Sequence, residues 1–175
     1  MASLGAGDPA DPGTVCGPVI SATQRERVAG YLKLAEEEGG RFATGGTVAE
    51  KNGELAGGFW IEPTVIAGLD NSARVAQEEI FGPVLTVIPH DGDDDAVRIA
   101  NESAYGLSGA VESGDLERAK SVARRIRTGT IGVNGGQWFG PDSPFGGYKQ
   151  SGVGREMGVA GFEEYLEIKT IAEPV

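Results

Sequence analysis

The sequence predicts an α/β fold built around a largely parallel sheet. Between residues 59 and 134, short apolar runs rich in β-branched residues alternate with runs of helical period. Their order is strand, helix, strand, helix, strand, which is typical of βαβ units. With 175 residues, 39% of them hydrophobic, the chain is long enough to bury one core.

The first forty residues open on an arm and continue as a helix. Residues 1–18 are rich in glycine, proline and aspartate and show no period, so we expect them to lie against something else. Ser21 and Gln24 have the spacing of a capping box, in which a hydroxyl and an amide satisfy each other's backbone donors. Apolar residues then recur on one helical face until Gly39 and Gly40 end the helix.

Short strands and turns are predicted next. Residues 41–46 form a short strand, and the polar, glycine-rich residues 51–58 indicate a hairpin connection. Residues 59–66 have the composition of a strand, which Pro63 interrupts because proline cannot donate to a ladder. Residues 72–79 are predicted to form a short helix.

The βαβ pattern occupies the middle of the chain. Residues 84–89 are predicted to form a buried strand, and Asp91–Asp95 favours a helix start because carboxylates suit the positive end of the helix dipole. A second strand is expected over 107–111. A helix then begins at Asp115, and a third strand follows over 128–134.

A glycine-rich segment, residues 141–158, precedes a short predicted helix over 155–165. Glycine at this density indicates backbone with positive φ or backbone that another group approaches closely. The spacing Gly152-x-Gly154-x-x-x-Gly158 is weak evidence for phosphate binding, because no strand runs into the first glycine. Two interpretations stay open: a long connection with several turns, or a binding surface on an anchored loop.

The stretch Gln77-Glu-Glu-Ile-Phe-Gly-Pro83 is a more specific signal. Two carboxylates stand just before an aromatic ring and a Gly-Pro bend that fixes the chain direction. Such a corner can present one carboxylate and one ring to a ligand. The alternative is a short helix with two exposed glutamates followed by a phenylalanine in the core.

Composition excludes several classes of function. The net charge of −11 argues against nucleic acid and anionic membrane surfaces as partners, and no apolar run is long enough to span a membrane. Residues 1–12 lack the features of a secretory signal. A single cysteine, Cys16, fits a reducing compartment, and we expect a cytoplasmic protein. Cys16 and His90 lie far apart in sequence, so no metal site is predicted.

Together these segments resemble the aldehyde dehydrogenase superfamily, from about Gly7 to Thr170. The markers occur in the order typical of that family: Gly7-Asp-Pro9, Gly17-Pro18, Gly45-Gly46, Gln77 to Pro83, Asn101 with Tyr105-Gly-Leu107, Val133-Asn134, Pro144-Phe-Gly-Gly-Tyr-Lys149, Ser151-Gly152 with Gly154-Arg-Glu156, and Tyr165 with Lys169. No single marker is decisive, but their common order and spacing are.

The resemblance implies NAD(P)-dependent oxidation of an aldehyde to an acid through a cysteine thiolate and a glutamate-activated water. It implies NAD or NADP as cofactor, with Glu79 on the nicotinamide ribose hydroxyls and Phe81 beside the nicotinamide. Phe139 and Phe145 match positions that line the aldehyde tunnel. Asn134, Gln137 and Trp138 lie on or near that loop in less definite roles.

The resemblance also implies how the chain is organised. Residues 1–164 match part of the mostly parallel, three-layer αβα catalytic domain, and residues 165–175 match an oligomerisation strand and tail. Leu166–Ile171 would pair with a neighbouring subunit, so we expect a homo-oligomer. That pairing explains why this segment, which alternates apolar and polar residues, has no partner strand in the chain.

The departure from the family pattern concerns the catalytic residues. In the family, the nucleophilic cysteine, the general-base glutamate and the dinucleotide-binding domain precede the Gly-Asp-Pro stretch, whereas Cys16 follows it. We therefore assign no catalytic residue and expect a truncated form that does not turn over alone. The alternative is a non-catalytic, oligomerising remnant that associates with itself or with a full-length relative.

Overall fold

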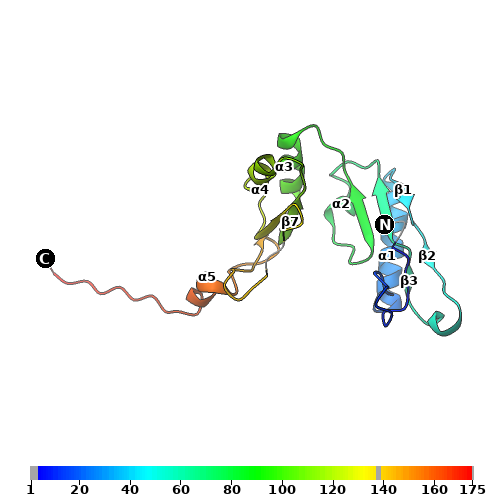
Figure 1. Ribbon diagram of the computed structural model, residues 1–175, viewed down its shortest axis with the longest axis horizontal. Coiled ribbons are helices and arrows are strands. Elements are labelled where there is room, and N and C mark those ends of the chain that lie inside the picture. The colour runs from blue at the N-terminus through cyan, green and yellow to red at the C-terminus, as the bar shows by residue number, and fades with distance from the viewer. Residues whose placement is uncertain (1–3, 137–138, 175) are drawn as a thin grey trace. The chain divides into compact units, whose positions relative to one another are not determined.

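The computed structural model describes residues 4–136 and 139–174 (Figure 1). The chain divides into two compact units, Met1–Pro89 and His90–Val175. Each unit combines helices with short strands, so the predicted α/β class is confirmed. None of the helices within the described residues is long and apolar enough to cross a bilayer.

The first unit contains a three-stranded mixed sheet and a hairpin. Its elements are α1 (Ala22–Glu37), β1 (Arg41–Thr44), β2 (Val48–Ala49), the 3-10 helix η1 (Gly53–Leu55), β3 (Trp60–Ile61), β4 (Thr64–Ala67), α2 (Arg74–Gln77) and β5 (Val84–Val87). In the order β1-β4-β5, β1 is antiparallel and β5 parallel to β4. The predicted hairpin joins β2 to β3, and Pro63 separates β3 from β4 as expected.

Two apolar clusters attach α1 to the rest of this unit. Ala35 packs with Ile66, Leu69 and Val75, which belong to β4, the turn after it and α2. Further toward the start of the helix, Val28 packs with Ile61 and Ile80. Ile80 lies inside the Gln77–Pro83 stretch, so the second cluster fixes that stretch against α1.

The arm that precedes α1 lies on the hairpin. Ala6 is buried with Ala49 and Trp60. The backbone nitrogen of Val19 donates to the carbonyl of Phe59 at 2.9 Å. The arm, whose sequence shows no helical or strand period, is therefore held in place by its contacts with the hairpin of β2 and β3.

Strand β5 differs from its prediction as a buried strand. Leu85 is 52% exposed and Val87 is 47% exposed. Within the described residues β5 hydrogen-bonds only to β4, so one of its edges is open. The apolar run predicted a strand correctly, but its burial would require more covering surface than this unit supplies.

The second unit contains two further two-stranded sheets. Its elements are α3 (Asp93–Glu102), β6 (Tyr105–Gly106), β7 (Ser108–Val111), α4 (Leu116–Ala123), β8 (Thr130–Val133), β9 (Tyr148–Lys149) and α5 (Gly158–Glu163). Strands β7 and β8 are parallel with α4 between them in sequence, which confirms a βαβ unit. Strands β6 and β9 are antiparallel and were not predicted, because β9 lies inside the glycine-rich segment.

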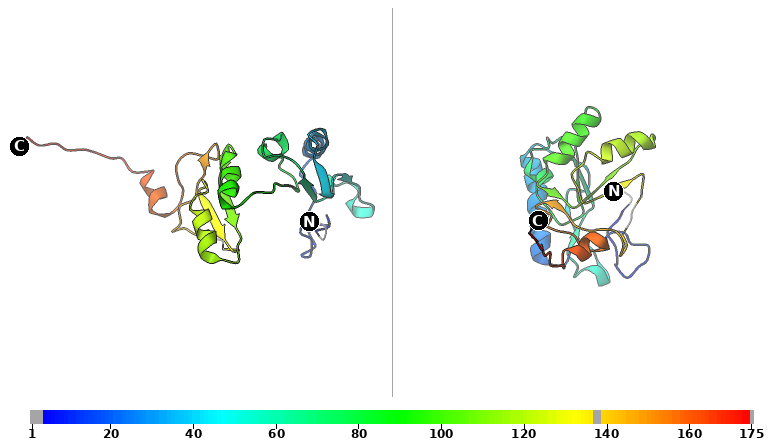
Figure 2. Two further views of the ribbon diagram at one scale, coloured as in Figure 1. Left: turned by 90° about the horizontal axis from the view of Figure 1, so that it is seen from above. Right: turned by 90° about the vertical axis from the view of Figure 1, so that its left-hand side faces the viewer.

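Helices α3 and α4 lie side by side, as Figures 1 and 2 show, and charged residues join them. Arg118 on α4 donates to both carboxylate oxygens of Asp93 at the start of α3. Arg125 donates to Asp94 at 2.6 Å. The acidic run predicted to favour a helix start therefore also holds the neighbouring helix.

The segment Leu166–Ile171, expected to pair with a neighbouring subunit, forms no strand within its own chain. The described residues of this tail are exposed and belong to no β ladder, and the chain leaves α5 in an extended course (Figure 1). A strand needs a hydrogen-bonded neighbour, and the described residues of the tail have none in this unit.

Candidate functional site

The Gln77–Pro83 stretch contains two adjacent glutamates, Glu78 and Glu79, whose side chains have different surroundings. The carboxylate of Glu78 accepts from Tyr31 Oη at 2.8 Å and from Arg74 Nε at 2.8 Å. The hydrogen bond from Arg74, followed by that from Tyr31, lowers the pKa of Glu78 below its usual range. The same contact with Glu78 raises the pKa of Tyr31. Glu78 is therefore occupied by structural contacts.

Glu79 and Phe81 are the residues of the stretch that remain available to a ligand. The Glu79 side chain is exposed, and within the described residues its carboxylate makes no hydrogen bond or ion pair. Phe81 is 73% exposed, whereas Ile80 between them is 8% exposed. The interpretation of Phe81 as a core residue is therefore wrong, because Ile80 takes the core position.

A shallow hollow of about 280 Å³ brings the predicted cofactor-binding residues together. It is lined by Glu79 and Phe81, with Leu85 of β5 among the other lining residues. The backbone of Phe81 has φ 57°, in the left-handed region. The corner thus presents a free carboxylate and an aromatic ring on one side of the first unit.

Side chains of α1 hold this corner by its carbonyl groups. Gln24 Nε2 donates to the carbonyls of Ile80 at 3.1 Å and Phe81 at 2.8 Å. An Nη of Arg27 donates to the carbonyl of Glu79 at 2.7 Å. The predicted capping box is only half formed within the described residues: Ser21 Oγ accepts from the backbone nitrogen of Gln24 at 3.1 Å, but the Ser21 nitrogen makes no hydrogen bond to the Gln24 side chain.

The two phenylalanines predicted to line an aldehyde tunnel are in contact in the second unit. The ring centroids of Phe139 and Phe145 lie 5.5 Å apart with an interplanar angle of 79°, an edge-to-face pair. Phe139 is 70% exposed and lines a hollow of about 820 Å³ over β7 and β8. Gln137 and Trp138 lie outside the described residues.

Phe145 and Asn134 are both fixed through hydrogen bonds. The backbone of Phe145 exchanges hydrogen bonds with that of Glu156, at 2.8 and 2.7 Å. Asn134 has φ 49°, and its side chain bonds both the carbonyl and the nitrogen of Ser113. This arrangement gives Asn134 a structural role at the end of β8.

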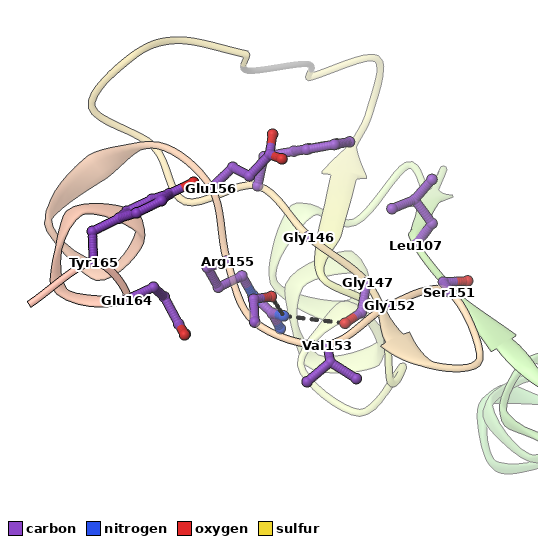
Figure 3. A pocket seen from close by; sticks show the side chains of 12 residues that line it. Leu107, Gly146, Gly147, Ser151, Gly152, Val153, Arg155, Glu156, Glu164 and Tyr165 are labelled. Carbon is purple, nitrogen blue, oxygen red and sulfur yellow. Dashed lines mark hydrogen bonds between the residues drawn. The ribbon is translucent and has the colours of Figure 1, made fainter.

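Two cations anchor the glycine-rich segment, and sequence reasoning missed both. Lys149 Nζ donates to the carbonyls of Asn101 and Ser103 at 2.8 Å each, at the end of α3. Arg155 Nη1 donates to the carbonyls of Gly147 at 3.1 Å and Gly154 at 2.7 Å (Figure 3). Arg155 and Phe145 both line a hollow of about 390 Å³. No local spacing could have revealed these partners.

Glycine is required where this segment approaches β8. A Cβ on Gly129 would lie 1.6 Å from the carbonyl oxygen of Gly146, far inside van der Waals contact. Gly146, Gly152, Gly154 and Gly158 all have positive φ, as the glycine density predicted. The segment is thus a connection with several turns that also positions Phe145.

The thiol of Cys16 is not activated. Burial, and then the charge of Glu62, raise its pKa. Its sulfur lies 3.7 Å from the carbonyl of Gly17. A reactive cysteine instead needs a cation or a helix N-terminus to lower its pKa. No group of three or more His, Cys, Asp or Glu side chains within the described residues could hold a metal ion.

The fold is that of an α/β protein whose first unit exposes a carboxylate and an aromatic ring in one hollow. The sequence profile described as "Aldehyde dehydrogenase family" matches residues 1–171, and the chain belongs to that family.

Relatives and solved structures agree with this assignment. The chain is 44% identical to betaine aldehyde dehydrogenase of Bacillus subtilis over 90% of its own length and 32% of the relative's. A crystal structure of betaine aldehyde dehydrogenase from Staphylococcus aureus in complex with NAD+ matches with TM-score 0.87 and 42% identity, over 93% of this chain and 32% of that one. Mycobacterium tuberculosis aldehyde dehydrogenase complexed with NAD+ matches with TM-score 0.83 and 49% identity, over 93% and 33%. The chain therefore spans about a third of the length of these relatives.

Proposed function

We propose that this chain supplies two surfaces of an NAD(P)-dependent aldehyde dehydrogenase: one for the nicotinamide end of the cofactor and one for the aldehyde. The single observation that carries the proposal is the free carboxylate of Glu79 beside the exposed ring of Phe81 in one hollow. NAD is favoured because the S. aureus and M. tuberculosis relatives are described in complexes with NAD+. NADP stays open.

The residues present fit the nicotinamide riboside part of the cofactor. A carboxylate without an internal partner can accept hydrogen bonds from both ribose hydroxyls, and charge strengthens those bonds. The exposed ring of Phe81 offers an apolar face to a flat heterocycle. When bound, NAD(P)+ accepts a hydride from the substrate. The work of Glu79 and Phe81 in this proposal is to bind and orient.

The aldehyde surface is the pair Phe139 and Phe145. Two rings in edge-to-face contact offer an apolar wall that suits an uncharged aldehyde. Arg155 and Lys149 stabilise the segment that carries Phe145 through hydrogen bonds to backbone carbonyls. We assign residues 1–164 to the catalytic domain and residues 165–175 to an oligomerisation tail.

We also propose that the chain does not oxidise aldehydes on its own and that it acts in the cytoplasm. Support for the first point comes from Cys16, whose raised pKa keeps the thiol protonated. Support for the second is a free cysteine, typical of a reducing compartment. The test is NADH production with a panel of aldehydes, using a full-length family member as positive control. Turnover that a thiol-alkylating reagent abolishes would contradict the proposal.

A titration with nicotinamide mononucleotide tests the cofactor surface. We expect weak binding, with a dissociation constant on the order of 1 mM, detected by NMR shifts at Glu79 and Phe81. Glu79→Gln should weaken it, while Glu54→Gln, a change of the same kind in η1, should not. Equal binding by the two variants would show that the carboxylate of Glu79 plays no part.

A second candidate function is that of a non-catalytic remnant that associates with itself or with a full-length relative. The exposed tail favours it, since Ile168 is 95% exposed and Ile171 is 81% exposed. An open extended segment can add a strand to the sheet edge of another chain. Nicotinamide mononucleotide binding at Glu79 separates the candidates, because a remnant selected only for association has no need of that surface.

A further inference from the structure

Gln24 reaches from the first turn of α1 to a segment 56 and 57 residues further along the chain. We propose that Gln24 is a positioning residue, whose side-chain amide holds the Phe81 ring in the orientation that the nicotinamide surface needs. This inference rests on the function proposed above. It concerns a residue that does not itself contact the ligand.

The Phe81 backbone needs such support. Its φ of 57° is rare for a bulky residue, and conformations of this kind persist only where the surroundings enforce them. Gln24 Nε2 donates to the carbonyl before this residue and to the carbonyl of the residue itself. The two bonds fix the peptide groups on both sides of Phe81, and so fix the direction of its side chain.

Other contacts from α1 act on the same corner. Arg27, one turn after Gln24, donates to the carbonyl of Glu79, so three consecutive carbonyls accept from side chains of one helix. Gly82 lies against Val28, where a Cβ would come within 2.6 Å of a Val28 methyl carbon. With Ile80 buried on the helix side, the ring of Phe81 is left facing the solvent.

Two single variants separate positioning from helix stability. Gln24→Glu keeps the size of the side chain and leaves the backbone nitrogen on Ser21 Oγ, but a carboxylate cannot donate to the two carbonyls. Ser21→Ala removes that helix cap and keeps the amide of Gln24. Both changes lie at the start of α1, so Ser21→Ala controls for any general loss of stability in this helix.

The experiment is NMR on the full 175-residue chain. In the unaltered protein the Gln24 side-chain NH₂ should show the shifts of a hydrogen-bonded amide. In Gln24→Glu the Ile80 and Phe81 carbonyl ¹³C shifts should move and the Phe81 ring signals should broaden. These signals should stay unchanged in Ser21→Ala. Phe81 signals in Gln24→Glu that match the unaltered protein would overturn the proposal.

A second measurement uses nicotinamide mononucleotide as the probe. In Gln24→Glu the dissociation constant of the probe should rise about tenfold, which corresponds to the loss of roughly one hydrogen bond. In Ser21→Ala it should change less than that. An equal loss in both variants would mean that Gln24 acts only through helix stability, and would overturn the proposal. If the unaltered chain does not bind the probe, the proposed function fails, and the Phe81 signals alone decide the role of Gln24.

Discussion

At the scale of single residues, the adjacent side chains of Glu78 and Glu79 differ in their contacts. Glu78 is bound by Tyr31 and Arg74, whereas Glu79 is free of partners in the described residues. The sequence identified the stretch and the alternatives but could not choose between the two carboxylates. Arg74 is an i,i+4 neighbour of Glu78, but Tyr31 lies 47 residues away and reaches Glu78 only in the folded chain. Family resemblance alone singled out Glu79.

The contacts of Glu78 predict how stability depends on pH. Because its pKa is lower in the folded chain, its contribution is present above the unfolded pKa of about 4.3 and is lost as the pH falls through the folded value. Glu78→Gln should therefore flatten the decline of the melting temperature below about pH 4.5. Melting curves from neutral to acidic pH test this. Glu79→Gln, which breaks no contact of this network, is the control, and an unchanged slope in Glu78→Gln would contradict the assignment.

At the scale of elements, the glycine-rich segment is ordered by contacts that are distant in sequence. Lys149 bonds carbonyls at the end of α3, and Gly129 allows Gly146 to approach β8. The sequence predicted positive φ at glycines and the main helices and strands, because these depend on local composition and period. It could not predict β6, β9 or the bond between Gln24 and Phe81, since each depends on a partner more than 40 residues away.

Gly129→Ala should disturb this segment specifically. Its Cβ would lie 1.6 Å from the carbonyl oxygen of Gly146, so the segment must shift. Overpacking of this kind costs about 1–3 kcal/mol, and the amides of Phe145 and Glu156 should exchange faster with solvent. Gly109→Ala in β7 is the matched control, because its Cβ would meet only a Thr128 methyl carbon at 3.8 Å. Similar exchange rates in the two variants would show that the close approach is not required.

At the scale of the whole molecule, the proposed association rests on exposed apolar surface among the described residues. The described residues of the tail are exposed, and apolar residues alternate along it. Part of β5 is also exposed. These features fit a chain that spans about a third of the length of its relatives. The sequence predicted a strand over the tail, but that strand has no partner among the described residues of the chain.

Self-association through the tail predicts a concentration-dependent mass. Sedimentation of the unaltered chain should show species heavier than 18.1 kDa at high concentration. Ile168→Asn should shift the distribution toward the monomer, because it removes an apolar contact. Lys169→Asn, on the opposite face of the extended segment, should shift it less. A strict monomer at every concentration would contradict pairing through Leu166–Ile171.

The most direct test of the account measures where the nicotinamide lies. With ¹³C-labelled protein and nicotinamide mononucleotide, nuclear Overhauser effects between ligand ring protons and the Phe81 ring should appear, and Glu79→Gln should reduce them. Ligand contacts that are confined to other parts of the chain, or that Glu79→Gln leaves unchanged, would contradict the claim that this corner receives the cofactor.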